Sequence, residues 1–311
     1  MFRVLVSDKI AKEGLSPLLN SDQIEIVEKN ISEVDDLETY DALLVRSATK
    51  VTDEVMSKMP NLKIIGRAGV GVDNIDVSAA TKREINVVNA PAGNTIATAE
   101  LTFALMLALT RKVCRANESI RNGEWNRSAF QGTELYGKTL GIIGFGRIGK
   151  EVAKRARAFE MKVLTNDPLL TEEEAQRHGV ICCERSEIFR TADIITLHAP
   201  ATPETKHLLN AETLAMTKPG VMIINAARGS LIDEVALKHF LETGHVAGAA
   251  MDVYSQEPLE DYDLVKMDQV VGTPHIAAST KEAQLKVAYV VAEEVLRFAN
   301  GQPVENSVNF K

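Results

Sequence analysis

Cysteine is scarce in this 311-residue sequence, and so is any motif that would use it for a disulfide or a metal. Only Cys114, Cys182 and Cys183 occur, none of them in a Cys-x-x-Cys spacing, and adjacent cysteines rarely bridge each other. This usage is typical of a reducing compartment. We therefore expect a cytoplasmic protein without a structural metal site.

Positive charge is also in deficit, because the sequence has 35 Lys and Arg residues but 43 Asp and Glu residues, which gives a formal net charge of −8. We expect neither a nucleic acid nor an anionic membrane as the main partner, although a local basic pocket is compatible with this balance. Long apolar runs are lacking too. The segment 101–110 is apolar but too short to span a bilayer, which favours a buried helix. The opening MFRVLVSD predicts a first strand rather than a signal peptide.

What the sequence does contain is a succession of short β-branched runs separated by helical patterns. Strands are predicted in a first series at 2–8, 24–30, 41–47, 62–69 and 85–91, and in a second at 138–144, 161–167, 179–183, 192–200, 220–227, 246–253 and 268–274. Helices are predicted at 52–59 and 76–83, as one continuous helix at 95–122, and at 279–299. Strands that alternate with helices predict mostly parallel sheets. The expected fold is therefore α/β, with two doubly wound parallel-sheet domains, the second inserted into the first.

A glycine-rich turn opens the second series. Gly144, Gly146 and Gly149 form G-x-G-x-x-G between a strand and a helix, and Asp167 ends the next strand, 18 residues after the third glycine. In a dinucleotide site the glycines permit a tight turn, close approach to the pyrophosphate and close helix packing. A carboxylate at the position of Asp167 binds the ribose hydroxyls of NAD and repels the extra phosphate of NADP. Glycines that serve only a turn are the alternative, but the flanking elements favour NAD.

Charged side chains follow several strands of the second series. Ligands of open α/β sheets bind outside the carboxyl ends of the strands. Of the six histidines, His198 and His275 lie at such strand ends and are therefore the candidates for the site. Arg228 follows one strand, and Asp252 and Glu257 follow another. Hydride transfer from a 2-hydroxy acid needs such a set: an arginine for the carboxylate, a histidine for the proton and a carboxylate to support the histidine. A surface ion-pair network is the alternative that spacing alone leaves open.

The motifs GFGRIG (144–149), NAARGS (225–230), DVYSQEP (252–258) and TPHIAAST (273–280) occur in this order. Together with Asp167 they resemble the D-isomer-specific 2-hydroxyacid dehydrogenases. The segments VRSATKVT, GRAGVGVDNID, NAPAGNTIATAE, NGEWNRSAFQGTEL and STKEAQ are similar to the members of that family that act on 3-phosphoglycerate. The resemblance covers essentially the whole chain.

The resemblance implies a Rossmann NAD-binding domain at 95–284, inserted into a flavodoxin-like substrate-binding domain formed by 1–94 and 285–311. It implies that Arg228, Glu257 and His275 are catalytic. The positions it assigns to NAD are Val70, Gly144, Gly146, Arg147, Ile148, Gly149, Asp167, Ala199, Ala226, Ala227, Arg228, Asp252, His275, Ile276, Ala277 and Ala278. The positions it assigns to substrate are Arg46, Ser47, Val70, Asn94, Arg127, Arg228 and His275.

The implied reaction is the NAD-dependent oxidation of 3-phosphoglycerate to 3-phosphohydroxypyruvate, the first step of L-serine biosynthesis. The family dimerises through its cofactor domains, which implies a homodimer or a dimer-based tetramer, with Arg127 reaching the phosphate in some members from the neighbouring subunit. Some members carry a second arginine where this sequence has Ala48, and many continue beyond the position of Lys311 into serine-sensing domains. A natural short form and a shortened chain both fit this ending. No feedback inhibition through such a domain is expected.

Two other functions stay open at this stage. Relatives that act on glyoxylate, hydroxypyruvate or D-lactate need no phosphate site. A non-enzymatic NAD-sensing protein of the corepressor type shares the fold and can keep the Arg, Glu and His residues.

Overall fold

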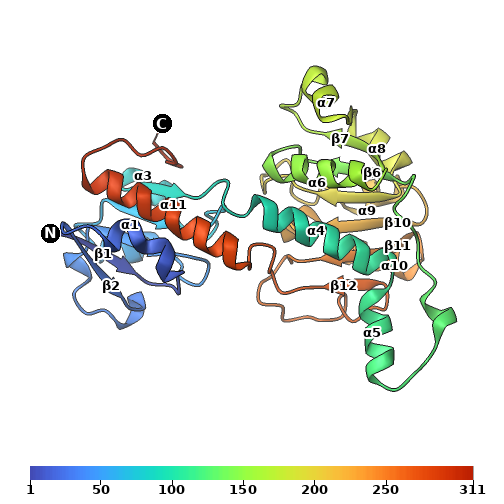
Figure 1. Cartoon of the computed structure of the whole chain (residues 1–311), viewed down its shortest axis with the longest axis horizontal. Coiled ribbons are helices and arrows are strands. Elements are labelled where there is room, and N and C mark those ends of the chain that lie inside the picture. Colours follow the sequence, from blue (N-terminus) through green and yellow to red (C-terminus); the bar gives the residue numbers. More distant parts are fainter. Residues whose placement is uncertain (311) are drawn as a thin grey trace. The chain divides into compact units, whose positions relative to one another are not determined.

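The computed structural model describes residues 1–310. The chain forms two compact units, the first made of Met1–Asn94 together with the chain from Ala278 onward, the second of Thr95–Ala277. Each unit is built around its own parallel sheet, with helices on both faces (Figure 1).

The strands of the first unit are β1 (Phe2–Val6), β2 (Ile24–Glu28), β3 (Ala42–Val45), β4 (Ile64–Arg67) and β5 (Asn86–Asn89). Its helices are α1 (Ser16–Leu19), α2 (Asp53–Ser57), α3 (Val77–Lys82) and α11 (Lys281–Ala299), with short 3-10 turns η1 (Lys12–Leu15), η2 (Ile31–Glu33) and η3 (Leu37–Thr39). The sheet order β2-β1-β3-β4-β5 is that of flavodoxin-like proteins.

The strands of the second unit are β6 (Thr139–Ile143), β7 (Lys162–Asn166), β8 (Ile181–Cys182), β9 (Ile194–Leu197), β10 (Val221–Asn225), β11 (Val246–Met251) and β12 (Val270–Gly272). Its helices are α4 (Thr95–Thr110), α5 (Val113–Arg121), α6 (Arg147–Ala158), α7 (Glu172–His178), α8 (Arg185–Thr191), α9 (Ala211–Ala215) and α10 (Glu234–Glu242), with η4 (Arg127–Phe130) and η5 (Gly229–Leu231). The sheet order β12-β11-β10-β9-β6-β7-β8 is that of a Rossmann fold with one further strand. The predicted fold class is confirmed.

The alternation of side chains along each strand sends apolar groups to both faces of the sheet. In the first unit Val4 packs on the face covered by α11, whereas its neighbour Leu5 packs on the face covered by α2 and α3. In the second unit Leu140 and Ile142 face α4 and α6, and Ile143 faces the opposite core with α8 and α10. Strands buried on both faces read as continuous apolar runs, which is why the sequence located them all.

The continuous helix predicted at 95–122 is wrong, because the chain forms α4 and α5 with a break between them. Lys112 adopts a left-handed conformation (φ 53°), and the Thr110 carbonyl accepts a 2.9 Å hydrogen bond from the Thr133 N–H. A returning segment thus occupies an acceptor that a continuous helix would use. The predicted end of the helical stretch is confirmed, since Asn122 caps α5 and Gly123 follows with φ 81°.

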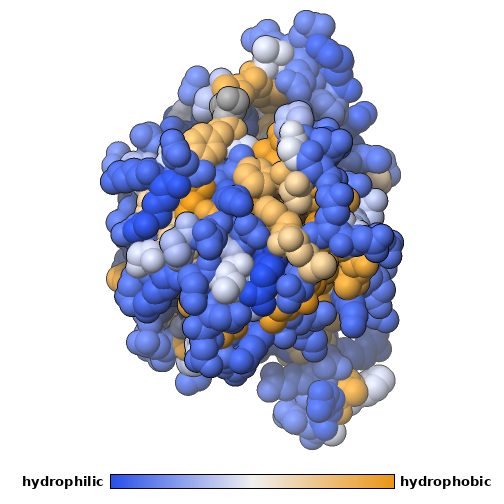
Figure 2. Space-filling model, turned by 90° about the vertical axis from the view of Figure 1, so that its left-hand side faces the viewer, coloured by the Kyte–Doolittle hydropathy of each residue, from blue (hydrophilic) through white to orange (hydrophobic). Residues whose placement is uncertain are grey.

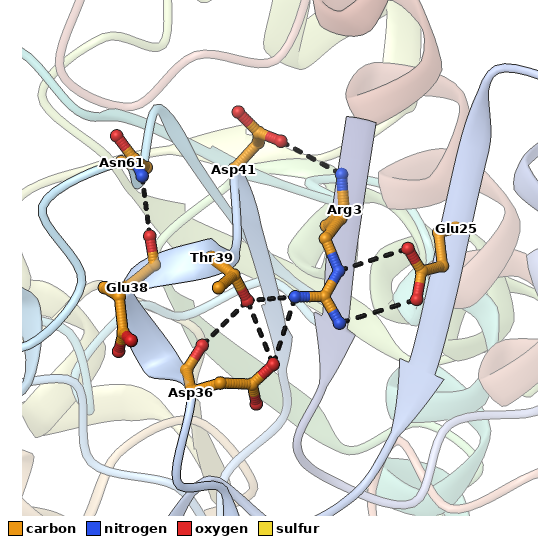
Figure 3. A network of polar contacts seen from close by, with 7 residues as sticks. All are labelled: Arg3, Glu25, Asp36, Glu38, Thr39, Asp41 and Asn61. Atoms are coloured by element: carbon orange, nitrogen blue, oxygen red, sulfur yellow. Dashed lines mark hydrogen bonds and ion pairs between the residues drawn. The ribbon is translucent and has the colours of Figure 1, made fainter. Parts of the chain in front are cut away.

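A network of polar contacts joins β1 and β2 to the segment before β3 (Figure 3). The Arg3 guanidinium donates to Glu25 Oε2 at 3.1 Å and to Asp36 Oδ2 at 3.1 Å, and it also contacts Thr39 Oγ1. The Asp41 carboxylate accepts from the Arg3 N–H at 3.0 Å. These contacts lie near the start of β1, away from the carboxyl ends of the strands, so we assign them to stability.

One face of the first unit is largely hydrophilic, with a limited apolar stripe across it (Figure 2). Leu285 and Tyr289, one turn apart on α11, are among the exposed apolar side chains of this unit. Among the helices in residues 1–310, none is long and apolar enough to cross a membrane.

Candidate active site

The charged residues that the sequence singled out in the second unit follow three adjacent strands. Arg228 lies three residues after β10, Asp252 comes directly after β11, and His275 lies three residues after β12. These strands are parallel neighbours in the sheet. Their carboxyl ends therefore share one edge, where ligands of open α/β sheets bind.

His275 and Glu257 form a pair at this edge. His275 Nδ1 lies 2.6 Å from Glu257 Oε2, and the other carboxylate oxygen, Oε1, accepts a 2.9 Å hydrogen bond from the Tyr254 N–H. The His275 side chain is 50% exposed and that of Glu257 is 32% exposed. Because Nδ1 is engaged, Nε2 is the ring nitrogen that can exchange a proton with a substrate.

The electrostatics of the pair follow from this contact. The hydrogen bond that His275 donates to Glu257 raises the pKa of His275 above 6.5 against the opposing effect of burial, and the charge of Asp252 adds to the rise. Burial acts to raise the pKa of Glu257, but the bonds from His275 and from the Tyr254 N–H outweigh it and hold that pKa below 4.5. The charge of Arg228 acts to lower both pKa values, so all three side chains belong to one site.

Asp252 shapes the loop that carries the histidine. It is fully buried, and its carboxylate accepts hydrogen bonds from Thr273 Oγ1 at 2.6 Å and from the N–H groups of Ile276 and Ala277 at 2.8 Å each. His275 itself has a left-handed backbone (φ 51°), which is unusual for a residue with a side chain. The buried carboxylate thus fixes the segment in which His275 holds this conformation.

Asn225 performs a comparable task for Arg228. Its buried side chain donates to the Arg228 carbonyl at 2.9 Å and accepts from the Ala227 N–H at 3.1 Å. The Arg228 guanidinium also donates to the Ala227 carbonyl at 2.7 Å. The NAARGS motif begins with Asn225, but the sequence analysis gave this residue no role, although a polar residue that ends a buried strand is a readable signal.

The glycine turn fits a dinucleotide. Gly144 has φ 94°, and a Cβ on it would lie 2.5 Å from the carbonyl carbon of His198. A Cβ on Gly149 would lie 2.3 Å from the Gly144 oxygen, so both positions need glycine for the fold. Gly146 is different, because a Cβ there would meet no atom within 4 Å. The N-terminus of α6 is therefore open at Gly146, as an anion-binding helix end requires.

Asp167 lies beside this turn at the end of β7. Its carboxylate accepts from the Phe145 N–H at 2.7 Å and from the Leu169 N–H at 2.9 Å. Each carboxylate oxygen can accept a second hydrogen bond, so the geometry is compatible with ribose hydroxyl donors. The carboxylate also stabilises the turn directly.

Of the two strand-end histidines, only His275 has a carboxylate partner. His198 has a buried Nδ1 without a partner in residues 1–310, its Nε2 lies 3.0 Å from Thr196 Oγ1, and burial lowers its pKa to about 4. A histidine with so low a pKa is neutral near pH 7 and is a poor proton acceptor. The geometry favours His275 for proton transfer.

Most of the other positions proposed for NAD follow strands of the second unit. Those on the turn and the first turn of α6 are Arg147 and Ile148, and those on the loops after β9, β10 and β12 are Ala199, Ala226, Ala227, Ile276, Ala277 and Ala278. Among residues 1–310, no group of three His, Cys, Asp or Glu side chains could hold a metal ion.

Substrate candidates of the first unit also gather at carboxyl ends of its strands. Arg46 follows β3 directly. Its N–H donates to Asp8 at 2.6 Å, and burial lowers the pKa of its guanidinium. Ser47 beside it is exposed. The Val70 carbonyl after β4 accepts from Asn89 at 2.6 Å, and Asn94 after β5 has a buried Oδ1 with no partner in the described chain.

Arg67 is a further candidate that the sequence reasoning missed. It ends β4, and its side chain lies over the next turn, since a Cβ on Gly69 would come within 1.6 Å of Arg67 Nη1. The signal was available, because a charged residue that ends a buried strand is also what identified Arg228. Arg127 lies elsewhere, exposed on η4 after α5.

The sequence is similar to a known family of proteins and to individual members of it. Residues 103–277 match the model of the "D-isomer specific 2-hydroxyacid dehydrogenase, NAD binding domain". D-3-phosphoglycerate dehydrogenase of Bacillus subtilis (strain 168) is 60% identical over 310 residues, and that of Archaeoglobus fulgidus is 49% identical over 311 residues. Each alignment covers 99% of this chain but only 59% of the relative, so the chain spans about three fifths of these proteins.

Solved structures resemble the chain over nearly its whole length. The TT0316 protein from Thermus thermophilus has a TM-score of 0.88 and 34% identity, covering 99% of this chain and 100% of its own. D-lactate dehydrogenase from Aquifex aeolicus, complexed with NAD and lactic acid, has a TM-score of 0.86 and 30% identity, covering 99% of both chains. A glyoxylate reductase from Paecilomyes thermophila has a TM-score of 0.88 and 29% identity, covering 99% of this chain and 98% of its own.

Proposed function

The chain belongs to the D-isomer specific 2-hydroxyacid dehydrogenases, and from this premise we propose that it oxidises 3-phosphoglycerate with NAD, the first step of L-serine biosynthesis. The observation that carries the proposal is the 2.6 Å contact between His275 and Glu257 at the strand edge that also holds Arg228. A histidine, a carboxylate and an arginine are the groups that dehydrogenation of a 2-hydroxy acid requires.

Each residue has a distinct task in the proposed reaction. Arg228 binds the substrate carboxylate and polarises the reacting oxygen, while His275 Nε2 accepts the proton of the hydroxyl group. Glu257 stabilises the imidazolium that forms and holds the ring in place through Nδ1. The chemistry that NAD supplies when bound is acceptance of the hydride from the carbon that bears the hydroxyl group. In the reverse direction His275 returns the proton to the oxygen.

The cofactor site proposed here uses the chain's own polar groups. The open N-terminus of α6 at Gly146 offers N–H groups to the pyrophosphate, and Asp167 offers its carboxylate to the adenosine ribose. A carboxylate at this position disfavours the 2′-phosphate of NADP because like charges repel. We therefore expect NAD to be preferred over NADP.

A phosphorylated substrate is supported by basic groups in a protein of net charge −8. Arg46 directly follows β3, Arg67 ends the neighbouring strand β4, and Arg127 is exposed on η4. Guanidinium groups suit phosphate because they donate two hydrogen bonds at once. The names of the two relatives from Bacillus subtilis and Archaeoglobus fulgidus point the same way.

A second candidate is a D-lactate dehydrogenase or a reductase of glyoxylate or hydroxypyruvate. The similarity to the solved structures of a D-lactate dehydrogenase and a glyoxylate reductase favours it. Ala48 also favours it, because some relatives that act on 3-phosphoglycerate have an arginine at this position. A non-enzymatic NAD sensor is a weaker candidate, because it has no need of a histidine paired with a glutamate.

A substrate panel read out by NADH absorbance tests the proposal. The purified protein is mixed with NAD and, in turn, with 3-phosphoglycerate, D-glycerate and D-lactate, and the reductase direction is tested with glyoxylate and NADH. We expect the highest kcat/KM for 3-phosphoglycerate. Faster turnover of an unphosphorylated acid supports the second candidate, and no turnover of any of them, with NADH still bound, supports the sensor.

We also propose that the protein is a homodimer, or a tetramer built from two such dimers, assembled through α5 and the segment after it. This segment exposes Val113, Ile120, Trp125 and Tyr136, with Trp125 81% exposed, and Figure 1 shows it projecting from the body of the second unit. Exposed apolar side chains in such number are typical of an interface. Light scattering on the wild type and on Trp125→Ala tests the assignment, with a smaller assembly expected for the variant.

A cytoplasmic location is proposed as well, supported by the free state of all three cysteines.

A further inference from the structure

Glu234, the first residue of α10, is turned toward the loop that carries Glu257. Its Oε1 accepts a 2.6 Å hydrogen bond from the Ser255 N–H, and its Oε2 accepts a 2.9 Å bond from Ser255 Oγ. The N-terminus of α10 has a different cap, because Asp233 accepts from the N–H groups of Val235 and Ala236. The Glu234 carboxylate is therefore not needed as the helix cap and is committed to Ser255.

Ser255 lies inside the turn that positions the catalytic carboxylate. The residue before it, Tyr254, donates its N–H to Glu257 Oε1 at 2.9 Å, and Glu257 Oε2 contacts His275. The buried Tyr254 hydroxyl donates toward the carbonyls of Met251 and Thr273, both at 3.2 Å, so one end of the turn is anchored. Glu234 holds the next residue of the turn, Ser255.

The segment after Arg228 packs against the same peptide unit. A Cβ on Gly229 would lie 1.9 Å from the carbonyl carbon and oxygen of Tyr254 and 2.5 Å from the Ser255 nitrogen. The backbone next to Arg228 thus rests directly on the 254–255 peptide, which only glycine permits. A shift of that peptide moves both the arginine side of the site and the Glu257 side.

We propose that Glu234 is a positioning residue for the dehydrogenase reaction, which holds the Ser255 peptide so that Glu257, His275 and the segment of Arg228 keep their mutual geometry. The inference rests on the proposed function of this site. It goes further because Glu234 belongs to none of the sequence motifs and is proposed to act on the Glu257–His275 pair indirectly, through the backbone.

Glu234 acts through the backbone rather than through its charge on the histidine. The charges that act most strongly on His275 are those of Glu257, Asp252 and Arg228, whereas both oxygens of the Glu234 carboxylate are bonded to Ser255. On its own helix Glu234 precedes Lys238, which pairs with Asp263 at 3.0 Å on the surface. The effect of a substitution at 234 on His275 therefore reports geometry.

Three variants separate this role from general effects of charge or helix stability. Glu234→Ala removes both bonds to Ser255. Glu234→Gln retains them, because its amide oxygen can accept from the Ser255 N–H while its NH2 group donates to Oγ. Glu242→Ala, at the exposed last position of the same helix, removes an equal charge far from Ser255.

The first readout is the titration of the His275 imidazole by NMR, assigned with a His275→Gln variant. In Glu234→Ala we expect its midpoint to fall toward 6.5, the ordinary value, because the Glu257 contact loosens. Glu234→Gln and Glu242→Ala are expected to keep the wild-type midpoint. A wild-type midpoint in Glu234→Ala, or equal shifts in Glu234→Ala and Glu242→Ala, would overturn the proposal.

The second readout is NADH formation. Glu234→Ala should lower kcat by about tenfold or more with a smaller change in KM, since small misplacements of catalytic groups cost on the order of 10- to 100-fold. Glu234→Gln should restore most of this loss, and a failure to restore it contradicts a positioning role. The NMR titration does not depend on turnover. If the protein turns over none of the substrates, the proposed function is wrong, but the titration still decides the role of Glu234.

Discussion

Glu257 and His275 are 18 residues apart in the chain, yet a carboxylate oxygen and a ring nitrogen of the two lie 2.6 Å apart. The contact exists because Glu257 follows β11, His275 follows β12, and these strands are neighbours in the sheet. The fully buried Asp252 fixes one loop and Tyr254 the other. The pair is thus a product of the strand order, with the polar groups of two loops setting its final geometry.

Glu257→Gln should change the pH dependence of oxidation. We expect wild-type kcat/KM to rise as pH rises through the pKa of His275, which lies above 6.5 because of the bond to Glu257. Without the carboxylate this limb moves to lower pH, and kcat falls by roughly 10²-fold because proton transfer loses its support. Steady-state rates across the pH range check both effects. An unmoved limb would mean that His275 is not the group that titrates.

The same pair makes a pH-dependent contribution to stability. The raised pKa of His275 stabilises the fold below pH 6.5, and this contribution is lost as pH rises through the folded-state pKa. The lowered pKa of Glu257 stabilises the fold above pH 4.5, and this part is lost as pH falls through its folded-state pKa. The difference in melting temperature between wild type and Glu257→Gln should therefore be largest between pH 4.5 and 6.5.

Gly146→Ala tests whether the glycine turn holds a cofactor. A Cβ there meets no atom within 4 Å and the backbone has φ −72°, so the melting temperature without cofactor should be unchanged. If the pyrophosphate approaches this backbone, the methyl group weakens NADH binding by about tenfold, which corresponds to about 1.4 kcal/mol. Fluorescence titration with NADH measures the change.

Gly144→Ala is the matched control for that experiment. The left-handed backbone and the close approach to His198 predict a loss of about 1–3 kcal/mol in the free energy of unfolding, independent of cofactor. Equal NADH affinity in wild type and Gly146→Ala would contradict the cofactor assignment of the turn.

The sequence predicted the fold well because both sheets are parallel and buried on both faces. Strands such as β9 and β10 are continuous apolar runs, and the glycine turn marks where the second sheet begins. The break between α4 and α5 was missed because it depends on the segment at Thr133, which returns from further along the chain. Helical periodicity carries no information about such a contact.

For the site, the motifs identified the proposed reacting groups but not the residues that support them. Arg228, Glu257 and His275 follow strands as charged residues, which is a readable pattern. Glu234 looks like an ordinary acidic residue in the first turn of a helix, and only the structure reveals its bonds to Ser255. Likewise, position 229 needs a glycine because the Tyr254 peptide, 25 residues further along the chain, packs against it. A local sequence pattern carries no information about such a contact.

Arg3→Ala should lower the melting temperature of the first unit without changing turnover. The variant loses the contacts to Glu25 and Asp36 and the packing of the guanidinium over the Tyr40 ring, 4.6 Å from its centroid. Arg3→Lys should lie between wild type and alanine, because a lysine cannot donate to both acids in the same fork geometry. Lys58→Ala, which breaks one exposed pair with Glu54 at the end of α2, should have little effect. Calorimetry compares the three, and an unchanged Arg3→Ala would remove the stabilising role of the network.

Arg127→Ala tests the phosphate assignment. If Arg127 contacts the phosphate, KM for 3-phosphoglycerate rises by about tenfold or more, whereas KM for D-glycerate changes little, because a bidentate contact to phosphate is lost only with the former. Arg177→Ala, an exposed arginine on α7 paired with Glu173, is the control. Equal effects of Arg127→Ala on both substrates would place it outside the phosphate site.

The most direct measurement of the central claim follows the hydrogen itself. 3-Phosphoglycerate that carries deuterium on the hydroxyl-bearing carbon is incubated with NAD and the protein, and mass spectrometry measures the deuterium content of the NADH formed. Transfer of the label by the wild type, abolished in His275→Ala although that variant still binds NADH, is the result we predict. No label in NADH with the wild type, or transfer that is undiminished in His275→Ala, would contradict the account.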